Sequence, residues 1–284
     1  MTMPFDPETD VRMRSESGIF DFTESQDKDS SEVVVGGDNS RDRIVVLGRR
    51  GAGKTVFLAR LYEALWQKRE GLLARAVDGV AHQRFMECVA RMEAGQWPEA
   101  TLAQSWSNLE IRYGTHEWVL GVLDYPGEVF RRAFVEDAQD EAARILRAYV
   151  DQAAAVLVLL DPIAAVQGGV EAAVDAEFGV SSALRRVQAA AGDVEVPVAL
   201  VLTKCDVAIG HIREVGSARA FVDHYLPGLV RDGGAFRVFA ASAVRSRADA
   251  LGQLRPATDK DALGIVEPLQ WCLKRLVKDG ASLE

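Results

Sequence analysis

Short runs of apolar residues alternate along this chain with longer segments in which apolar residues recur every three or four positions. The first run covers residues 44–46, and the segment after it carries Phe57, Leu58, Leu61 and Leu65 at helical spacing. The later runs cover residues 108–114, 117–125, 154–161, 196–203 and 236–242. Short apolar runs bounded by turn residues predict strands. The alternation predicts a three-layer α/β fold, in which a mostly parallel sheet has helices on both faces.

Two of the runs, at 108–114 and 117–125, are too close together for a crossover helix. A turn at Gly114 and Thr115 joins them, and a connection of this length predicts an antiparallel hairpin. We therefore expect one antiparallel strand at the edge of an otherwise parallel sheet.

Composition divides the chain into two parts. Residues 1–41 are rich in Asp, Glu, Ser and Gly and poor in apolar residues, which predicts a disordered acidic tail. We expect residues 42–284 to form one domain, with a helical insertion at about 70–96. The apolar positions of that insertion recur at helical spacing and are Phe85, Val89 and Met92.

The loop between the first strand and the first helix fits the phosphate-binding pattern G-x-x-x-x-G-K-[ST]. Glycines let backbone N–H groups approach phosphate oxygens, and the helix N-terminus adds partial positive charge. We expect Lys54 to contact the β- and γ-phosphates and Thr55 to bind Mg²⁺. The expected phosphate-binding residues are Gly48, Arg49, Arg50, Gly51, Ala52, Gly53, Lys54 and Thr55.

A second motif, D-x-x-G, follows the run at 117–125, at a strand end where ligands of open α/β sheets bind. The carboxylate of Asp124 can hold Mg²⁺ through water, and the N–H of Gly127 can contact a γ-phosphate. The alternative for these residues is an ordinary Asp-Tyr-Pro-Gly turn.

Two later motifs concern the base. In T-K-x-D, the carboxylate of Asp206 can accept hydrogen bonds from N1–H and the exocyclic amine of guanine, which adenine cannot offer. Thr203 opens this motif, and the stem of Lys204 is expected to lie along the base. The backbone N–H groups of Ser242 and Ala243 can contact guanine O6. The four motifs occur in the order that a GTPase requires, so the expected ligands are GTP or GDP with Mg²⁺.

These residues resemble the Ras-like (TRAFAC) P-loop GTPases over about residues 42–279. The resemblance implies a six-stranded sheet and two switch segments ordered by the γ-phosphate. It also implies a threonine that closes on Mg²⁺. We expect this to be Thr101, which precedes Asp124 by 23 residues, because the rival Thr115 sits in the hairpin turn. The expected catalytic residues are Lys54, Thr101, Gly127, Glu128 and Arg50.

Two short segments, W-P-E-A-T at 97–101 and D-Y-P-G-E at 124–128, look like bacterial double-GTPase and YcjX-like proteins. This resemblance implies that a second GTPase, encoded alongside, is a partner. A protein effector or regulator is expected in any case, because a nucleotide switch acts through protein contacts.

The chain departs from the Ras-like pattern at Glu128, where Ras-like enzymes carry a glutamine that orients the attacking water. A carboxylate there repels the γ-phosphate unless a cation compensates, and Arg50 can pair with either group. Arg50 then either obstructs an arginine finger from a partner or is itself an internal finger. We interpret Arg49 as a solvated charge at the loop mouth and expect hydrolysis to be slow or partner-dependent.

The net charge and the hydropathy of the chain limit the classes of binding partner that we expect. The formal net charge is −9 and no long basic block occurs, so no nucleic-acid partner is expected. No apolar run approaches the about 20 residues of a membrane span, which predicts a cytoplasmic protein and leaves peripheral membrane contact open.

The leading interpretation is a GTP-binding switch that hydrolyses GTP to GDP and phosphate. One alternative is a GTP-bound interaction module with little hydrolysis. A second alternative is an ATP-using P-loop NTPase, in which Asp124 is the acidic residue that holds the metal and Asp206 does not read the base.

Overall fold

A computed structural model of the chain describes residues 43–66, 71–99, 105–229, 235–257 and 262–280. The predicted tail at 1–41 and the expected switch residue Thr101 lie outside the described residues. Ser40–Glu284 forms one compact unit.

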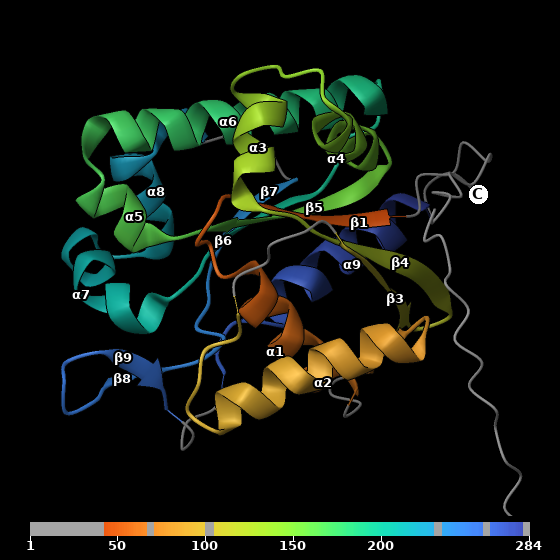
Figure 1. The fold of residues 1–284 in the computed structure, drawn as a ribbon. Coiled ribbons are helices and arrows are strands. Elements are labelled where there is room, and N and C mark those ends of the chain that lie inside the picture. The colour runs from red at the N-terminus through yellow and green to blue at the C-terminus, as the bar shows by residue number, and fades with distance from the viewer. Residues whose placement is uncertain (1–42, 67–70, 100–104, 230–234, 258–261, 281–284) are drawn as a thin grey trace, which may run out of the picture. The chain divides into compact units, whose positions relative to one another are not determined.

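The larger unit is built around a seven-stranded sheet (Figure 1). Its strands, in spatial order, are β2 (Leu72–Ala76), β3 (Ser105–Tyr113), β4 (His116–Asp124), β1 (Arg43–Gly48), β5 (Ala153–Leu160), β6 (Val198–Leu202) and β7 (Phe236–Ala240). From β4 to β7 neighbouring strands are parallel, whereas β3 is antiparallel to both of its neighbours. The predicted mostly parallel α/β sheet is therefore confirmed.

The strand count differs from the expected six, and the cause lies in the predicted insertion. Residues 70–96 contain not only a helix but also β2, which pairs with β3 from Leu72↔Tyr113 to Ala76↔Leu109. Leu72 and Ala74 are buried on one face of β2 while Arg75 is exposed. Strand β2 forms the sheet edge, so the antiparallel strand β3 lies one place inside it.

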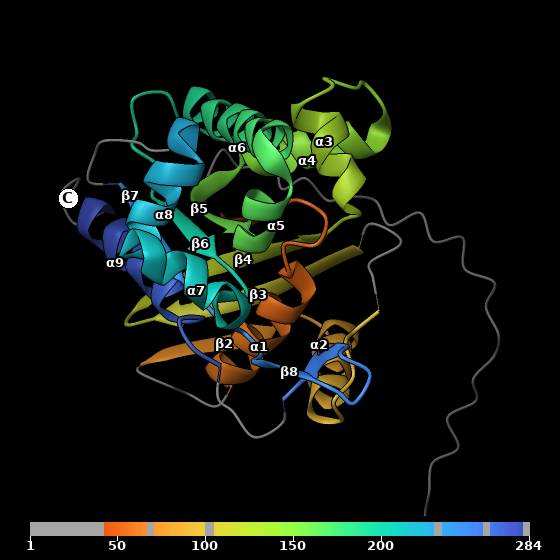
Figure 2. The ribbon, with the colours of Figure 1, turned by 90° about the vertical axis from the view of Figure 1, so that its left-hand side faces the viewer.

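Helices cover both faces of the sheet (Figures 1 and 2). One face packs α1 (Lys54–Trp66), α2 (Gly79–Glu93) and α9 (Glu267–Gly280). The other packs α3 (Gly127–Phe134), α4 (Glu141–Asp151), α6 (Gly169–Ala191), α7 (Cys205–Val215) and α8 (Ala218–Tyr225). Alternate residues of β1 supply the two cores, because Ile44 and Val46 face α1 and α9 whereas Val45 and Leu47 face α4 and α6. Among the described residues, no helix is both long and apolar enough to cross a membrane.

Three small elements complete the unit. They are α5 (Pro162–Gln167), the 3₁₀ turn η1 (Pro227–Leu229), and a hairpin of β8 (Ser246–Ala248) and β9 (Leu254–Pro256). Within the described residues the hairpin forms its own two-stranded sheet, and it lies beside the carboxyl end of α2 in both views (Figures 1 and 2). Nothing in the hydrophobic pattern of the chain predicted this hairpin.

The side chain of Tyr149, in α4, fixes the junction between β1 and β4. Its hydroxyl accepts a hydrogen bond from the N–H of Val46 at 3.2 Å and donates one to the carbonyl of Gly121. A Cβ at Gly121 would lie 3.0 Å from the Tyr149 ring, so glycine is needed for this approach. Burial raises the pKa of Tyr149 well above its ordinary range.

We expect Tyr149→Phe to lower the free energy of unfolding by about 1–3 kcal/mol, because it leaves two buried backbone groups without their partner. Denaturant unfolding at constant slope measures this loss. Tyr113→Phe, in the partly buried end of β3, is the matched control and is expected to change stability by less than about 0.5 kcal/mol. Equal stability of the two variants would contradict the role given to the Tyr149 hydroxyl.

Candidate nucleotide-binding site

The loop between β1 and α1 depends on its glycines. Gly51 and Gly53 have φ values of +79° and +77°, which side chains with a Cβ rarely adopt. Gly48 ends β1 against β5, where an added Cβ would lie 2.9 Å from the carbonyl oxygen of Leu159. The glycine pattern that identified the loop in the sequence therefore has a backbone reason at each of these positions.

Lys54 opens α1 and bends back over the loop. Its Nζ donates to the carbonyl oxygens of Gly48 at 3.0 Å and Arg49 at 3.4 Å. The ammonium also lies 4.5 Å from the centre of the Tyr125 ring, and the side chain is largely buried. A cation is thus held at the centre of the loop, where the sequence places the phosphates.

Tyr125 ties the D-x-x-G segment to this loop. Its hydroxyl accepts from the N–H of Gly48 and donates to the carbonyl of Gly48, both at 3.1 Å. Asp124, the last residue of β4, therefore lies next to a residue that touches the phosphate-binding loop. The side chain of Asp124 lies outside the described part of the structure. Tyr125 lies inside the D-x-x-G motif, but the motif itself assigns it no role.

Glu128, in the first turn of α3, forms an ion pair with Arg50. Both side chains are exposed, with 53% and 76% of their surface accessible. The N–H of Glu128 itself lowers the pKa of this carboxyl most, and the Arg50 guanidinium lowers it further. Glu128 therefore stays ionised at neutral pH, and its charge is opposed by the arginine that the sequence had suggested.

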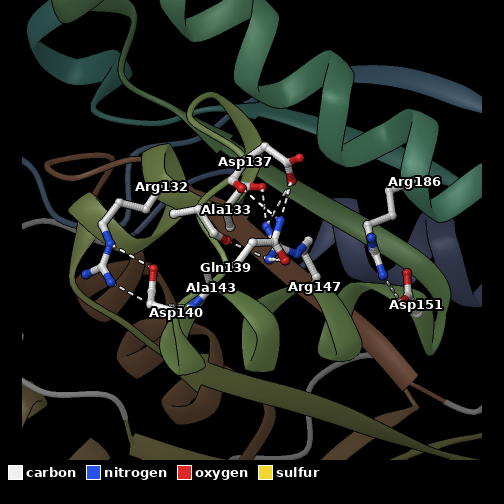
Figure 3. Close-up of polar contacts among 10 residues, drawn as sticks. Arg132, Ala133, Asp137, Gln139, Asp140, Ala143, Arg147, Asp151 and Arg186 are labelled. Atoms are coloured by element: carbon white, nitrogen blue, oxygen red, sulfur yellow. Dashed lines mark hydrogen bonds and ion pairs between the residues drawn. The ribbon is translucent and has the colours of Figure 1, made fainter.

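The far end of α3 is fixed by buried Arg147 of α4 (Figure 3). Its guanidinium donates to the carbonyl oxygens of Ala133 at 3.1 Å and Ala138 at 2.6 Å. Arg132 also pairs with Asp140, which caps the start of α4. A cation that binds the last carbonyls of a helix stabilises that end, so α3 is held firmly at the end remote from Glu128.

The residues of the T-K-x-D motif are joined to other segments of the cleft by hydrogen bonds. The two carboxylate oxygens of Asp206 accept hydrogen bonds from the Ser242 hydroxyl at 3.0 Å and from the N–H of Ser246 at 2.7 Å. The hydroxyl of Thr203 is within donor distance of the carbonyls of Ala52 and Leu160, at 3.0 and 2.9 Å. These bonds join T-K-x-D to the phosphate-binding loop and to the strand end that carries Ser242.

Asp161 is a site residue that sequence reasoning missed. One of its oxygens accepts from the N–H groups of Ile163 and Ala164 and caps α5, while the other pairs with Lys204 Nζ at 2.6 Å. Lys204 has a φ of +52°, and its stem passes Gly53, so the pair fixes a side chain that spans the loop. The signal was an aspartate directly after the buried run of β5 and before a proline.

Arg49 differs from the solvated charge that the sequence suggested. Its Nη2 pairs with Asp175 of α6 at 2.7 Å, and about a third of each side chain is exposed. The interpretation as a simple solvated charge was wrong, because α6 passes close enough to offer a carboxylate.

These segments surround one cleft of about 770 Å³. Ten of the predicted site residues line it, namely Arg50, Gly51, Gly53, Lys54, Thr55, Glu128, Thr203, Lys204, Asp206 and Ala243. Gly48, Arg49, Ala52 and Ser242 do not line the cleft but contact residues that do. Trp97, Pro98, Ser246 and Leu254 also line it. Trp97 and Pro98 lie in the segment of the expected switch residue Thr101, whereas the sequence gave the segment of Ser246 and Leu254 no role in the site.

The sequence comparison identifies the family. The Double-GTPase 1 family matches residues 45–197, more than half of the chain. The chain belongs to the Double-GTPase 1 family. The matched part of this double-GTPase domain includes the phosphate-binding loop and D-x-x-G and ends before T-K-x-D. The predicted resemblance to double GTPases is confirmed, and no curated protein matches the chain.

Several solved structures are similar to this double-GTPase chain. The Methanosarcina barkeri Roco2 RocCORdC structure bound to GDP is 17% identical with a TM-score of 0.38, and the match covers 83% of this chain and 49% of that one. The nucleolar GTP-binding protein 1 from Plasmodium falciparum is 11% identical with a TM-score of 0.45, over 86% and 91% of the two chains. The signal recognition particle receptor SRb-GTP/SRX complex from Chaetomium thermophilum is 11% identical with a TM-score of 0.38, over 74% and 93%.

We expect Asp161→Asn to weaken GDP binding by about two- to ten-fold while leaving thermal stability nearly unchanged. Asparagine still caps α5, but it removes the charge that holds Lys204. Asp161→Ala is the companion variant and is expected to lose about 1 kcal/mol of stability as well, because it removes the cap. Titration with a fluorescent GDP and thermal unfolding measure both effects, and unchanged GDP affinity in both variants would contradict the positioning role.

Proposed function

We propose that this double-GTPase domain is a guanine-nucleotide switch that binds GTP with Mg²⁺ and hydrolyses it to GDP and phosphate. The observation that carries the proposal is that Lys204 and Asp206 line the same cleft as the loop from Gly51 to Thr55. A single nucleotide in this cleft would place its base at Asp206 and its phosphates at Lys54.

Guanine is the base that fits best, because Asp206 offers only acceptors. Ser242 and Ser246 hold its two oxygens by one bond each, which fixes the plane of the carboxylate. A carboxylate oxygen has two lone-pair directions, so the group keeps acceptor capacity for N1–H and the exocyclic amine of guanine. The N–H of Ala243, at the end of the strand segment, is proposed to contact guanine O6.

The metal proposed for the phosphates is Mg²⁺, which takes oxygen ligands and needs few from the protein when phosphates supply the others. The donor set fits, since Thr55 lines the cleft in the first turn of α1 beside Lys54. Thr55, Asp124 and Thr101 are proposed to hold the ion. When bound, Mg²⁺ neutralises charge on the phosphate oxygens.

The residues of the chain then divide the phosphate chemistry. Lys54 binds the β- and γ-phosphates from its place over the loop, and the N–H of Gly127 contacts the γ-phosphate. Glu128 stands where the water-orienting residue of related enzymes lies, but its charge is tied to Arg50. Because this carboxylate is committed to an ion pair, we propose that intrinsic hydrolysis is slow or depends on a partner.

The partner proposed is a protein that reads the nucleotide state, and a second GTPase encoded alongside is the first choice. The ion pair of Arg50 and Glu128 is exposed at the cleft mouth, so a partner surface can reach and replace it. The same pair also favours a second candidate function, a GTP-bound interaction module that hardly hydrolyses, in which case GTP stays bound after purification.

A single-turnover assay with labelled GTP and Mg²⁺ tests the function. We expect unlabelled GTP to compete and ATP not to compete, and phosphate release to be slower than about 10⁻² s⁻¹, the rate of a GTPase with its arginine in cis. Asp206→Asn is expected to lower the preference for GTP over ATP, because it replaces an acceptor pair by a mixed amide. Equal competition by ATP in the native protein would move the chain to the ATP-using class.

Arg50→Ala is expected to weaken GTP binding about two- to five-fold more than GDP binding, because it leaves the Glu128 charge opposed to the γ-phosphate. Adding Glu128→Gln to that variant is the matched control and is expected to restore the GTP affinity. Competition titrations with both nucleotides measure the ratio. Equal losses for GTP and GDP would contradict charge compensation, and a loss of hydrolysis that Glu128→Gln does not repair would identify Arg50 as an internal finger.

A further inference from the structure

Two segments that are far apart in the sequence contact each other where they line the cleft. Trp97 lies after α2, and its Nε1–H donates to the carbonyl of Leu254 in β9 at 2.8 Å. In Figures 1 and 2 the hairpin of β8 and β9 lies beside the segment that leaves α2. Trp97 and Leu254 both line the cleft. This hydrogen bond therefore connects two walls of the cleft that are 157 residues apart in sequence.

The Trp97 side of this contact is well supported. Gly95 has a φ of +72° and turns the chain at the end of α2, and the N–H of Gln96 donates to the carbonyl of Arg91 at 2.9 Å. Arg91 also pairs with Glu99 at 2.9 Å. The indole is thus presented to the hairpin by a short segment that begins in a backbone hydrogen bond to α2 and also contacts α2 through an exposed ion pair.

The hairpin side is connected to the base site. The N–H of Ser246, the first residue of β8, donates to Asp206 at 2.7 Å, and Ser246 pairs with Pro256 of β9 in the hairpin register. Leu254 lies two residues before Pro256 on the same strand. The hairpin is therefore connected to the base site through Ser246 of β8 and to Trp97 through Leu254 of β9.

We propose that this hairpin is a latch on the nucleotide cleft and that Trp97 is the positioning residue that closes it. The inference rests on the proposed function, since the latched ligand is a guanine nucleotide held at Asp206. Entry and exit of the nucleotide require the bond between Trp97 and Leu254 to break. Opening exposes the base side of the cleft, whereas Lys54 and the phosphate-binding loop stay in place.

Asp249 permits a test that touches neither the nucleotide nor the cleft. One of its oxygens accepts from the N–H groups of Leu251 and Gln253, each at 2.9 Å, and the other accepts from Arg255 at 3.2 Å. These bonds form the turn between β8 and β9, and Asp249 is absent from the residues that line the cleft. Asp249→Ala is expected to loosen the hairpin. Leu251→Ala, at the exposed tip, keeps the backbone bonds and is the matched control.

The experiment measures association and dissociation rates of fluorescent N-methylanthraniloyl-GDP on the full chain with Mg²⁺. Trp97→Phe keeps an aromatic ring and removes the N–H donor. We expect both Trp97→Phe and Asp249→Ala to raise the dissociation rate about three- to ten-fold, as expected for the loss of one hydrogen bond, and to raise the association rate as well. The double variant is expected to be no faster than the faster single variant, and Leu251→Ala is expected to match the native rates.

Faster association separates a latch from simple damage, because a damaged site loses affinity without gaining association rate. If native protein binds the labelled GDP and unlabelled GDP displaces it, but both variants keep the native rates, the latch is wrong and the proposed function stands. Additive effects in the double variant would also overturn the latch. If unlabelled ADP displaces the label as well as GDP does, or the native protein does not bind it, the proposed function fails and the latch fails with it.

Discussion

The parallel hydrogen bonding of β1, β5, β6 and β7 determines where the phosphate-binding loop, Asp161, the T-K-x-D motif and Ser242 lie. Gly48 is paired with Leu159, Leu160 with Leu202, and Leu202 with Ala240, so these strands end at one edge of the sheet. The N–H groups of Thr203 and Ala241 continue this pairing by donating to the carbonyls of Leu160 and Leu202, at 2.8 Å each. Segments that lie far apart in the sequence thus begin their loops side by side, at the edge where ligands of open sheets bind.

The cations along this edge are already engaged within the protein, and they differ in how easily a ligand can recruit them. Lys54 is buried on loop carbonyls, and the carboxylate that holds Lys204 is mostly buried, so both side chains are preorganised for a ligand. Arg50 is bound only to exposed Glu128, a kind of pair that contributes little to stability. The cleft therefore combines a rigid floor with a replaceable ion pair at its mouth, which is the arrangement expected where a γ-phosphate or a partner has to change the surface.

The sequence predicted what depends on local pattern and missed what depends on contacts between distant segments. Strands β1 and β3 to β7 and the glycine loop follow from periodicity and spacing, and each lies where it was expected. The T-K-x-D motif follows β6 and lines the cleft, and its role in reading the base stays a prediction. Strand β2 was missed because its five residues, Leu-Leu-Ala-Arg-Ala, have a hydrophobic pattern that also fits the first turn of a helix. Tertiary pairing with β3 decides their conformation. Asp161 follows a predicted strand and Tyr125 lies inside the D-x-x-G motif, so both positions could be located in the sequence. Their partners, Lys204 and Gly48, could not be predicted because they are far away in the sequence.

The hairpin of β8 and β9 also depends on contacts between segments that are distant in sequence, and this dependence is related to the function proposed for it. Strands of three residues have too little hydrophobic surface to fold alone, so this hairpin depends on its turn bonds at Asp249 and on its contacts with Asp206 and Trp97. Few buried apolar contacts and several exposed hydrogen bonds are the properties of segments that open at low free-energy cost. The carboxyl ends of the buried parallel strands can stay fixed while this hairpin moves. A nucleotide cleft needs both properties, because it must hold its ligand in one geometry and still exchange it.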